Sequence, residues 1–143
     1  MEIKQYDNNI NWNHICQYEK LSEAFMNENK NNLNWYLISA YQILSEPFIE
    51  KHINLVDWPC ISYKQKLSES FIDKYYKYVT WYYIWYNQKL SQIFIEKFYF
   101  KIDWKVISER QQLDESFIER NIDKLDLNLI SLKQKLSEQF ITK

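Results

Sequence analysis

Glycine is absent from this chain of 143 residues, whereas average usage of about 7% would place about ten glycines in it. Its absence excludes the glycine-rich loops that cradle phosphates and the glycine fingerprint of dinucleotide-binding folds. The helices also cannot end on a left-handed glycine, which is a common way for a helix to stop. We therefore expect Asn, the next-best left-handed residue, to take this role at some corners.

The chain also lacks an excess charge, a long apolar run and a set of cysteines. Its net charge is −1, which by itself attracts neither nucleic acid nor an anionic membrane. The sequence has no run of about 18 apolar residues, so we expect no membrane span, and the first residues have no apolar signal core. Two cysteines, Cys16 and Cys60, do not make a disulfide framework. This cysteine usage favours a reducing, intracellular and cytoplasmic setting. We also expect a folded protein, since 46% of its residues are hydrophobic.

A 23-residue repeat organises the whole sequence. Its clearest half is Leu-Ser-Glu-x-Phe-Ile, and variants of this half begin at Leu21, Leu44, Leu67, Leu90, Leu113 and Leu136. Every spacing is 23 residues, with no insertion. A fixed period of this length is typical of a solenoid, in which each repeat buries its apolar face against its neighbours.

The part of each repeat before the Leu predicts one short helix. Ten residues before the Leu stand helix N-cap residues in all six copies: Asn11, Asn34, Asp57, Thr80, Asp103 and Asp126. A Trp follows the cap in five copies, and an Ile and a Gln (Glu19 in the first copy) come three and seven residues later on the same helical face. We expect a helix of eight or nine residues that stops at the Leu.

The part after the Leu predicts a second helix. It starts at another cap residue, Ser or Asp114, and in five copies continues with a Glu that complements the helix dipole. Apolar residues four, five and nine positions after the Leu form one stripe, and charged pairs such as Glu50-Lys51 lie opposite. The expected fold is an all-α solenoid of short two-helix repeats. It has about five full repeats, half-repeats at both ends (near Ile3 and after Leu136), and a single domain over residues 1–143.

The pattern Val-Asp-Trp-x-x-Ile-Ser-x-x-Gln-x-Leu-Ser-Glu-x-Phe-Ile-Glu-Lys resembles tandem helical repeats of poorly characterised proteins from giant viruses, phages and AT-rich bacteria. The resemblance covers about Ile10 to Lys143 and is poorest at Trp85, where most copies have Ser, and at 27–32. It implies a helical repeat and a viral or mobile-element origin, and it transfers no catalytic residues.

The repeated polar and aromatic positions are most simply structural. We expect the five Trp rings to lie in the core and the Gln amides to bond the backbone of adjacent corners. The Glu residues are expected to complement helix dipoles rather than bind a cation. His14 and Cys60 share one variable, mostly apolar position and are expected to pack. No catalytic arrangement, metal site or cofactor site is supported, so we expect no enzyme.

The variable positions on the first helix are the candidate binding site. They lie eight, four and three residues before the Leu and are expected to face outward on a concave surface. The predicted partner-binding residues are Tyr36, Tyr41, Tyr63, Tyr82, Tyr86, Lys105 and Arg110. The alternative is that these rings only fill grooves between repeats. The aromatic run 75–86 favours an exposed patch, because one repeat cannot bury all of its rings.

The predicted function is non-enzymatic binding of another protein, with no membrane association. The viral resemblance suggests a viral or phage inhibitor of a host protein, for example one of an antiviral system. One alternative is single-stranded nucleic-acid binding, in which Tyr stacks on bases while Lys64, Lys105, Arg110 and Lys133 lie near phosphates. Another is a structural homo-oligomer, such as a homodimer, built through the uncapped ends.

Overall fold

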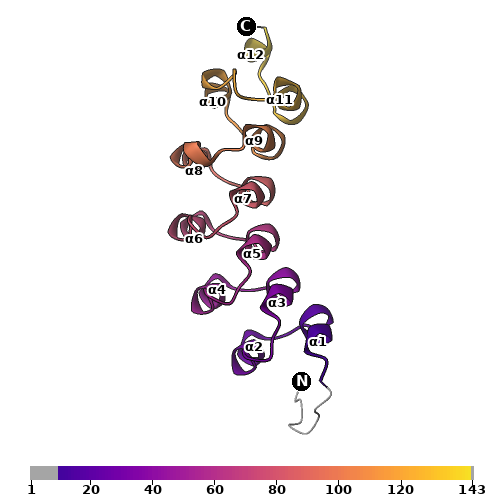
Figure 1. The fold of residues 1–143 in the computed structure, drawn as a ribbon. Coiled ribbons are helices and arrows are strands. Elements are labelled where there is room, and N and C mark those ends of the chain that lie inside the picture. Colours follow the sequence, from indigo (N-terminus) through magenta and orange to yellow (C-terminus); the bar gives the residue numbers. More distant parts are fainter. Residues whose placement is uncertain (1–9, 143) are drawn as a thin grey trace. The chain divides into compact units, whose positions relative to one another are not determined.

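The computed structural model describes residues 10–142, and within this range the chain forms twelve α-helices, a short 3-10 helix and no strand (Figure 1). We call the helices before each Leu the Trp helices: α1 (Trp12–Tyr18), α3 (Trp35–Tyr41), α5 (Trp58–Lys64), α7 (Trp81–Asn87), α9 (Trp104–Arg110) and α11 (Leu127–Lys133). The Phe helices follow each Leu: α2 (Glu23–Glu28), α4 (Glu46–Lys51), α6 (Glu69–Lys74), α8 (Gln92–Lys97), α10 (Glu115–Arg120) and α12 (Glu138–Ile141). The 3-10 helix is η1 (Tyr99–Lys101). The predicted all-α fold of two-helix repeats is confirmed, and the half-repeat at Ile3 lies outside the described residues.

The chain divides into two compact units, Met1–Gln65 and Lys66–Lys143. In the described part of the first unit, α1 packs against α3 and α3 against α5. In the second unit, α7 packs against α9 and α9 against α11. Successive Trp helices are one repeat apart, so each unit is a stack of repeats (Figure 1). The single domain over 1–143 stays a prediction.

The predicted helix caps begin nearly every helix. The Asn34 side chain accepts a hydrogen bond from the backbone N–H of Leu37 at 3.3 Å, and that of Asp57 accepts one from Cys60 at 2.9 Å. The Ser caps of the Phe helices do the same, as Ser45 does for Phe48 at 3.3 Å. Thr80 is the exception, because its side chain makes no capping bond to α7. These short helices therefore carry their start signals in the local sequence.

The helices end without any left-handed residue, which corrects the expected role for Asn. No residue in the described range 10–142 has a positive φ. The Trp helices also end earlier than expected, after seven residues, and the following Gln is extended, with φ −92° and ψ 153° at Gln42. The chain leaves each Trp helix directly into extended backbone, and the residues after the Phe helices keep a negative φ, as at His52 with φ −114° and ψ 29°. The lack of glycine therefore costs the helix ends no strain.

From α3 to α10, the core is made by an Ile from each Trp helix and a Phe-Ile pair from each Phe helix. Side chains such as Ile38, Ile61, Ile84 and Ile107 are fully buried, and so are Ile49, Ile72, Ile95 and Ile118. On the Phe helices the stripe ends eight residues after the Leu rather than nine. Phe98 is buried there, whereas its neighbour Tyr99 is exposed. The helix ends one residue before this position, so the next side chain is turned outward.

The charged side of the Phe helices is ion-paired between repeats, as expected. Lys97 on α8 pairs with Asp73 on α6 at 2.8 Å. Arg120 on α10 pairs with Glu96 on α8 at 2.7 Å. All four side chains are well exposed to water, so each pair contributes little to stability.

The five Trp rings at the start of the Trp helices are half-buried, so their predicted place in the core is wrong. The Trp35 indole N–H donates to the carbonyl of Lys30 at 2.9 Å, and that of Trp81 to the carbonyl of Tyr76 at 3.1 Å. Trp35 also stacks on Phe48, with ring centroids 6.1 Å apart. The ring thus covers the edge of the core and ties down the corner before its helix, because its N–H needs an acceptor there.

Trp85 is the Trp that lies in the core, at a position where three other repeats have a buried Ser: Ser39, Ser62 and Ser108. Ser108 donates to the carbonyl of Trp104 at 2.7 Å and accepts from the backbone N–H of Asp126 at 3.1 Å. Trp85 cannot accept such a bond. Its indole N–H instead donates to the carbonyl of Lys101, at 2.8 Å, at the end of η1. Ile102 is only half-buried where the corresponding Val79 is buried. The large ring therefore reshapes one corner of the second unit.

The Gln residues join successive repeats as predicted. Gln111 accepts the backbone N–H of Leu90 at 3.2 Å and donates to the carbonyls of Trp85 and Gln88 at 2.6 and 2.7 Å. In the first unit, Gln42 makes the same three bonds to the preceding repeat, at 2.8 to 3.0 Å. Each buried amide satisfies three backbone groups that would otherwise be left without partners.

The Glu residues also join repeats, a role that the sequence analysis missed. The two carboxylate oxygens of Glu23 accept from the backbone N–H and the hydroxyl of Ser45, at 2.7 and 3.1 Å. At one junction between repeats, Gln92 stands in place of this Glu and Asp114 of the next repeat stands in place of the Ser cap. Gln92 accepts the Asp114 backbone N–H at 3.4 Å. A Glu facing Asp114 would place two carboxylates together, so the paired change avoids their repulsion.

Candidate partner-binding surface

The candidate binding residues occupy the Trp helices of both units. In the first unit Tyr36, Tyr41 and Tyr63 expose about half of their side-chain surface, at 58%, 54% and 44%. In the second unit Tyr82 is 50% exposed and Tyr86 is half-buried. Lys105 and Arg110, on α9, are both exposed. The exposed rings are not buried in grooves between repeats and Tyr86 is intermediate, while the binding role of these residues stays a prediction.

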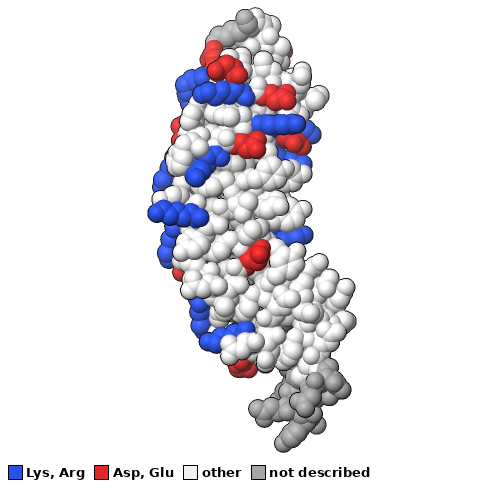
Figure 2. Space-filling model, in the orientation of Figure 1, with Lys and Arg blue, Asp and Glu red and all other residues white. Residues whose placement is uncertain are grey.

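The first unit carries an aromatic patch on α3 and α5. These two helices pack together, so Tyr36, Tyr41 and Tyr63 belong to adjoining helices. Ile43, directly after α3, is 88% exposed and was missed by the sequence analysis. It stands where most other repeats have Lys, and this exchange was the available signal. The surface seen over α3 in Figure 2 has few charged side chains.

The second unit holds a stack of two Tyr rings and an Arg. The Tyr82 and Tyr86 rings are stacked, with centroids 6.0 Å apart and planes 18° apart. The Arg110 guanidinium lies 3.9 Å from the centroid of the Tyr86 ring and donates a hydrogen bond to its hydroxyl. Arg110 also pairs with Glu109, at 3.2 Å. The structure thus brings together Tyr86 of one repeat and Arg110 of the next, whereas the sequence analysis placed them only on equivalent helices.

A cavity of about 270 Å³ lies beside this stack, within the second unit. It is lined by Lys89, Leu90, Glu109, Arg110, Gln111, Gln112, Lys133 and Gln134. Charged side chains of both signs are visible over α9 and α11 in Figure 2. Lys133 entered the sequence analysis only as a residue near phosphates, and Lys89 was not considered.

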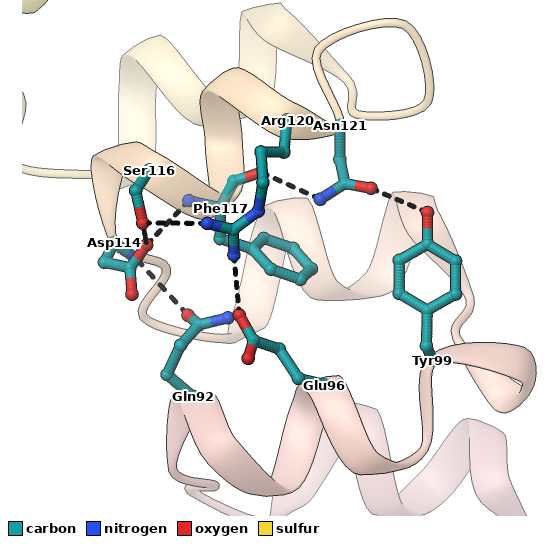
Figure 3. Close-up of polar contacts among 8 residues, drawn as sticks. All are labelled: Gln92, Glu96, Tyr99, Asp114, Ser116, Phe117, Arg120 and Asn121. Carbon is teal, nitrogen blue, oxygen red and sulfur yellow. Dashed lines mark hydrogen bonds and ion pairs between the residues drawn. The ribbon is translucent and has the colours of Figure 1, made fainter.

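A second cavity of about 400 Å³ lies between α8 and α10 and is lined by Glu96, Tyr99, Phe117, Arg120 and Asn121 (Figure 3). Asn121 stands where other repeats place rings such as His52 and Phe98. The Tyr99 hydroxyl donates to the Asn121 side chain at 2.7 Å, and the Asn121 amide donates to the carbonyl of Phe117 at 2.9 Å. These polar groups already bond one another, so the arrangement serves to join two repeats.

The aromatic run 75–86 is exposed only in part. Tyr76, Tyr78 and Tyr82 are exposed, in agreement with the expected patch. Trp85 is fully buried and packs on Trp81, with centroids 5.2 Å apart. On α7, the Tyr82 ring of the stack above is exposed, whereas the Tyr86 ring is half-buried.

His14 and Cys60 occupy the same repeat position but have different surroundings. His14 is exposed and packs against the Tyr18 ring, with centroids 4.9 Å apart. Cys60 is half-buried. Burial, with the adjacent Asp57 side chain, raises the pKa of the Cys60 thiol to about 11. Within the described residues no group of three His, Cys, Asp or Glu side chains could hold a metal ion.

The raised pKa predicts slow alkylation of Cys60. In a Cys16→Ser variant, we expect the rate of reaction with iodoacetamide to rise with pH around a midpoint near 11, because only the thiolate reacts. In denaturant the midpoint should fall to about 8.5, the value of an ordinary cysteine. The same midpoint in both states would contradict this assignment.

No protein family, curated protein or solved structure was found to match this chain. The class of this protein is therefore defined by its fold alone: it is an α-solenoid of 23-residue, two-helix repeats. Among residues 10–142, no helix combines the length and the apolar character needed to cross a membrane.

Proposed function

We propose that this protein is a non-enzymatic binding module whose Trp helices carry contact sites for another protein. The observation that carries the proposal is the exposure of Tyr36, Tyr41, Tyr63 and Tyr82 on helices whose Ile side chains are fully buried. Tyr gives a large, rigid contact area and has both apolar and hydrogen-bonding atoms, so it is enriched in protein interfaces. The uncharged Ile43 beside the first patch adds apolar area of the same kind.

The surroundings of the rings favour protein over single-stranded nucleic acid. Base stacking needs a free ring face. Arg110 lies against the Tyr86 ring, which is also stacked on Tyr82. The net charge of −1 gives no overall attraction for phosphates.

The biological role that we propose is that of a viral or phage inhibitor which occupies a host protein, for example a component of an antiviral system, in the host cytoplasm. This part rests on the resemblance of the repeat to those of viral and mobile-element proteins. A solenoid that presents several aromatic contact sites and no reaction chemistry suits an inhibitor that acts by occupying a surface.

A second candidate function is self-association, and it rests on different residues. Leu127 and Leu132 on α11 and Ile141 on α12 are exposed, with Leu132 at 76%. An apolar group of this kind could be covered by another copy of the chain. Light scattering at high protein concentration tests it: a monomer throughout would exclude this candidate and leave the first one untouched.

The test of the first candidate is a Tyr82→Ala/Tyr86→Ala variant, measured against a partner captured from the host. We expect the affinity to fall at least about thirtyfold, which corresponds to the 2 kcal/mol typical of an interface hot spot. Circular dichroism should show unchanged helicity.

The matched control is Tyr78→Ala, because Tyr78 is as exposed as Tyr82 but lies outside the Trp helices. It should bind normally. Equal affinity of the double variant and the wild type would reject the Tyr82–Tyr86 stack as the site. The Phe-helix face with Glu50, Asp73, Glu96 and Glu119 would then be the next candidate. Binding that weakens steeply between about 50 and 200 mM salt would point to nucleic acid instead.

A further inference from the structure

The cavity beside Arg110 gathers positive charge in a chain that is negative overall. Its lining includes three cations, Lys89, Arg110 and Lys133, and one carboxylate, Glu109. The three cations come from three successive repeats of the second unit. Arg110 and Lys133 share one repeat position, and Lys89 shares another with Gln112 and Lys135. The local charge is thus opposite in sign to the net charge of −1.

Arg110 is held in place on one side of this cavity. Its guanidinium lies on the Tyr86 ring, donates to the Tyr86 hydroxyl and pairs with Glu109. These contacts limit the rotation of a long side chain that is otherwise exposed, and so reduce the entropy lost when it binds a ligand. A guanidinium has five N–H donors, so it retains donors for a further acceptor.

The remaining lining supplies hydrogen-bonding groups as well as apolar surface. Gln112 is exposed and lies at the repeat position of Lys89. Gln111 and Gln134, which bond the preceding repeat, line the cavity together with Leu90. Two Lys and an Arg in one lining suit a small anionic group, and about 270 Å³ has room for a carboxylate side chain.

We propose that this basic cavity binds an Asp or Glu side chain in an acidic segment of the protein partner. The inference rests on the proposed function and adds to it the chemistry of the partner: acidic residues that follow an apolar or aromatic contact. Tyr82 and Tyr86 would receive the apolar part, and Arg110 would hold the carboxylate through paired N–H···O bonds. The cavity is a local site and the neighbouring ring is covered by Arg110, which favours a carboxylate side chain over a nucleic-acid strand.

The experiment uses the full chain and a fluorescent peptide in which Glu alternates with Ala, with oligothymidylate of equal net charge as the competing probe. We expect the peptide to bind more tightly than oligothymidylate. Arg110→Gln should weaken peptide binding about tenfold, as for loss of a charged hydrogen bond. Arg110→Lys, which keeps the charge but not the planar fork, should also weaken it, several-fold. Lys89→Gln/Arg110→Gln/Lys133→Gln should abolish it.

The matched control is Lys51→Gln/Lys77→Gln/Lys101→Gln, which removes the same charge from exposed positions outside the cavity. It should leave peptide binding within about twofold of wild type, since salt screens the interaction between the peptide and exposed charges far from the cavity. The inference is overturned if oligothymidylate binds more tightly than the peptide, if the control triple variant weakens binding as much as the cavity triple variant, or if the peptide does not bind.

The Tyr82→Ala variant separates this inference from the proposed function, because it keeps the Tyr86 ring on which Arg110 lies. If Tyr82→Ala leaves partner affinity unchanged while the cavity variants lose the peptide, the carboxylate site stands and the aromatic site fails. If Tyr82→Ala weakens partner binding and the cavity variants weaken binding of neither partner nor peptide, the aromatic site stands and the carboxylate site fails.

Discussion

Replacing Gln111 with Leu is expected to lower the free energy of unfolding by about 3–5 kcal/mol, because it leaves three buried backbone groups without partners. These are the N–H of Leu90 and the carbonyls of Trp85 and Gln88, which the Gln111 amide now bonds at 2.6 to 3.2 Å. Leu has a similar size, so a cavity contributes little to the loss. Denaturant unfolding followed by circular dichroism measures the effect.

Gln112→Leu is the matched control for this prediction. Gln112 is the next residue in the chain and is exposed, so the same substitution should change stability by less than about 0.5 kcal/mol. A loss below about 1 kcal/mol for Gln111→Leu would mean that water replaces the amide in this position, and that the Gln bonds do not hold the repeats together.

Truncating Trp85 to Ala is expected to cost about 3–5 kcal/mol, as for other large residues removed from a core. Trp85 is fully buried and its indole N–H holds the carbonyl of Lys101, so the substitution leaves both a large void and an unpaired acceptor. The η1 segment should also loosen. Hydrogen exchange of its amides measures this local effect, and denaturant unfolding measures the global one.

Trp81→Ala is the comparison for Trp85. The sequence analysis assigned the core role to the Trp81 position, but this ring is only half-buried, so its truncation should cost clearly less than that of Trp85. Equal losses would show that burial of the ring does not decide its contribution. A larger loss for Trp81 would show that the bond to the Tyr76 carbonyl and the packing on Phe98 matter more than burial.

The candidate site could be predicted only in part. The outward direction of Tyr36, Tyr63 and Tyr82 follows from helical spacing relative to the buried Ile, and the structure agrees. The stack of Arg110 on Tyr86 could not be predicted, because the two residues are 24 positions apart and the sequence does not give the distance between repeats. The same holds for the cavity, whose cations come from three repeats.

The sequence by itself determined the period, the two helices of each repeat, their caps and the role of Gln. These follow from residue types at fixed spacing, and a capping or helix-face preference acts within about four residues along the chain. The tertiary structure alone decided which large apolar side chains are buried. Ile and Trp share one face of the Trp helix, yet Ile38 is fully buried and Trp35 is not. It also decided that the chain becomes extended at Gln42, where the amide reaches groups 21 to 26 residues away. Burial depends on contacts between repeats, and the spacing of residues within one repeat does not determine these contacts.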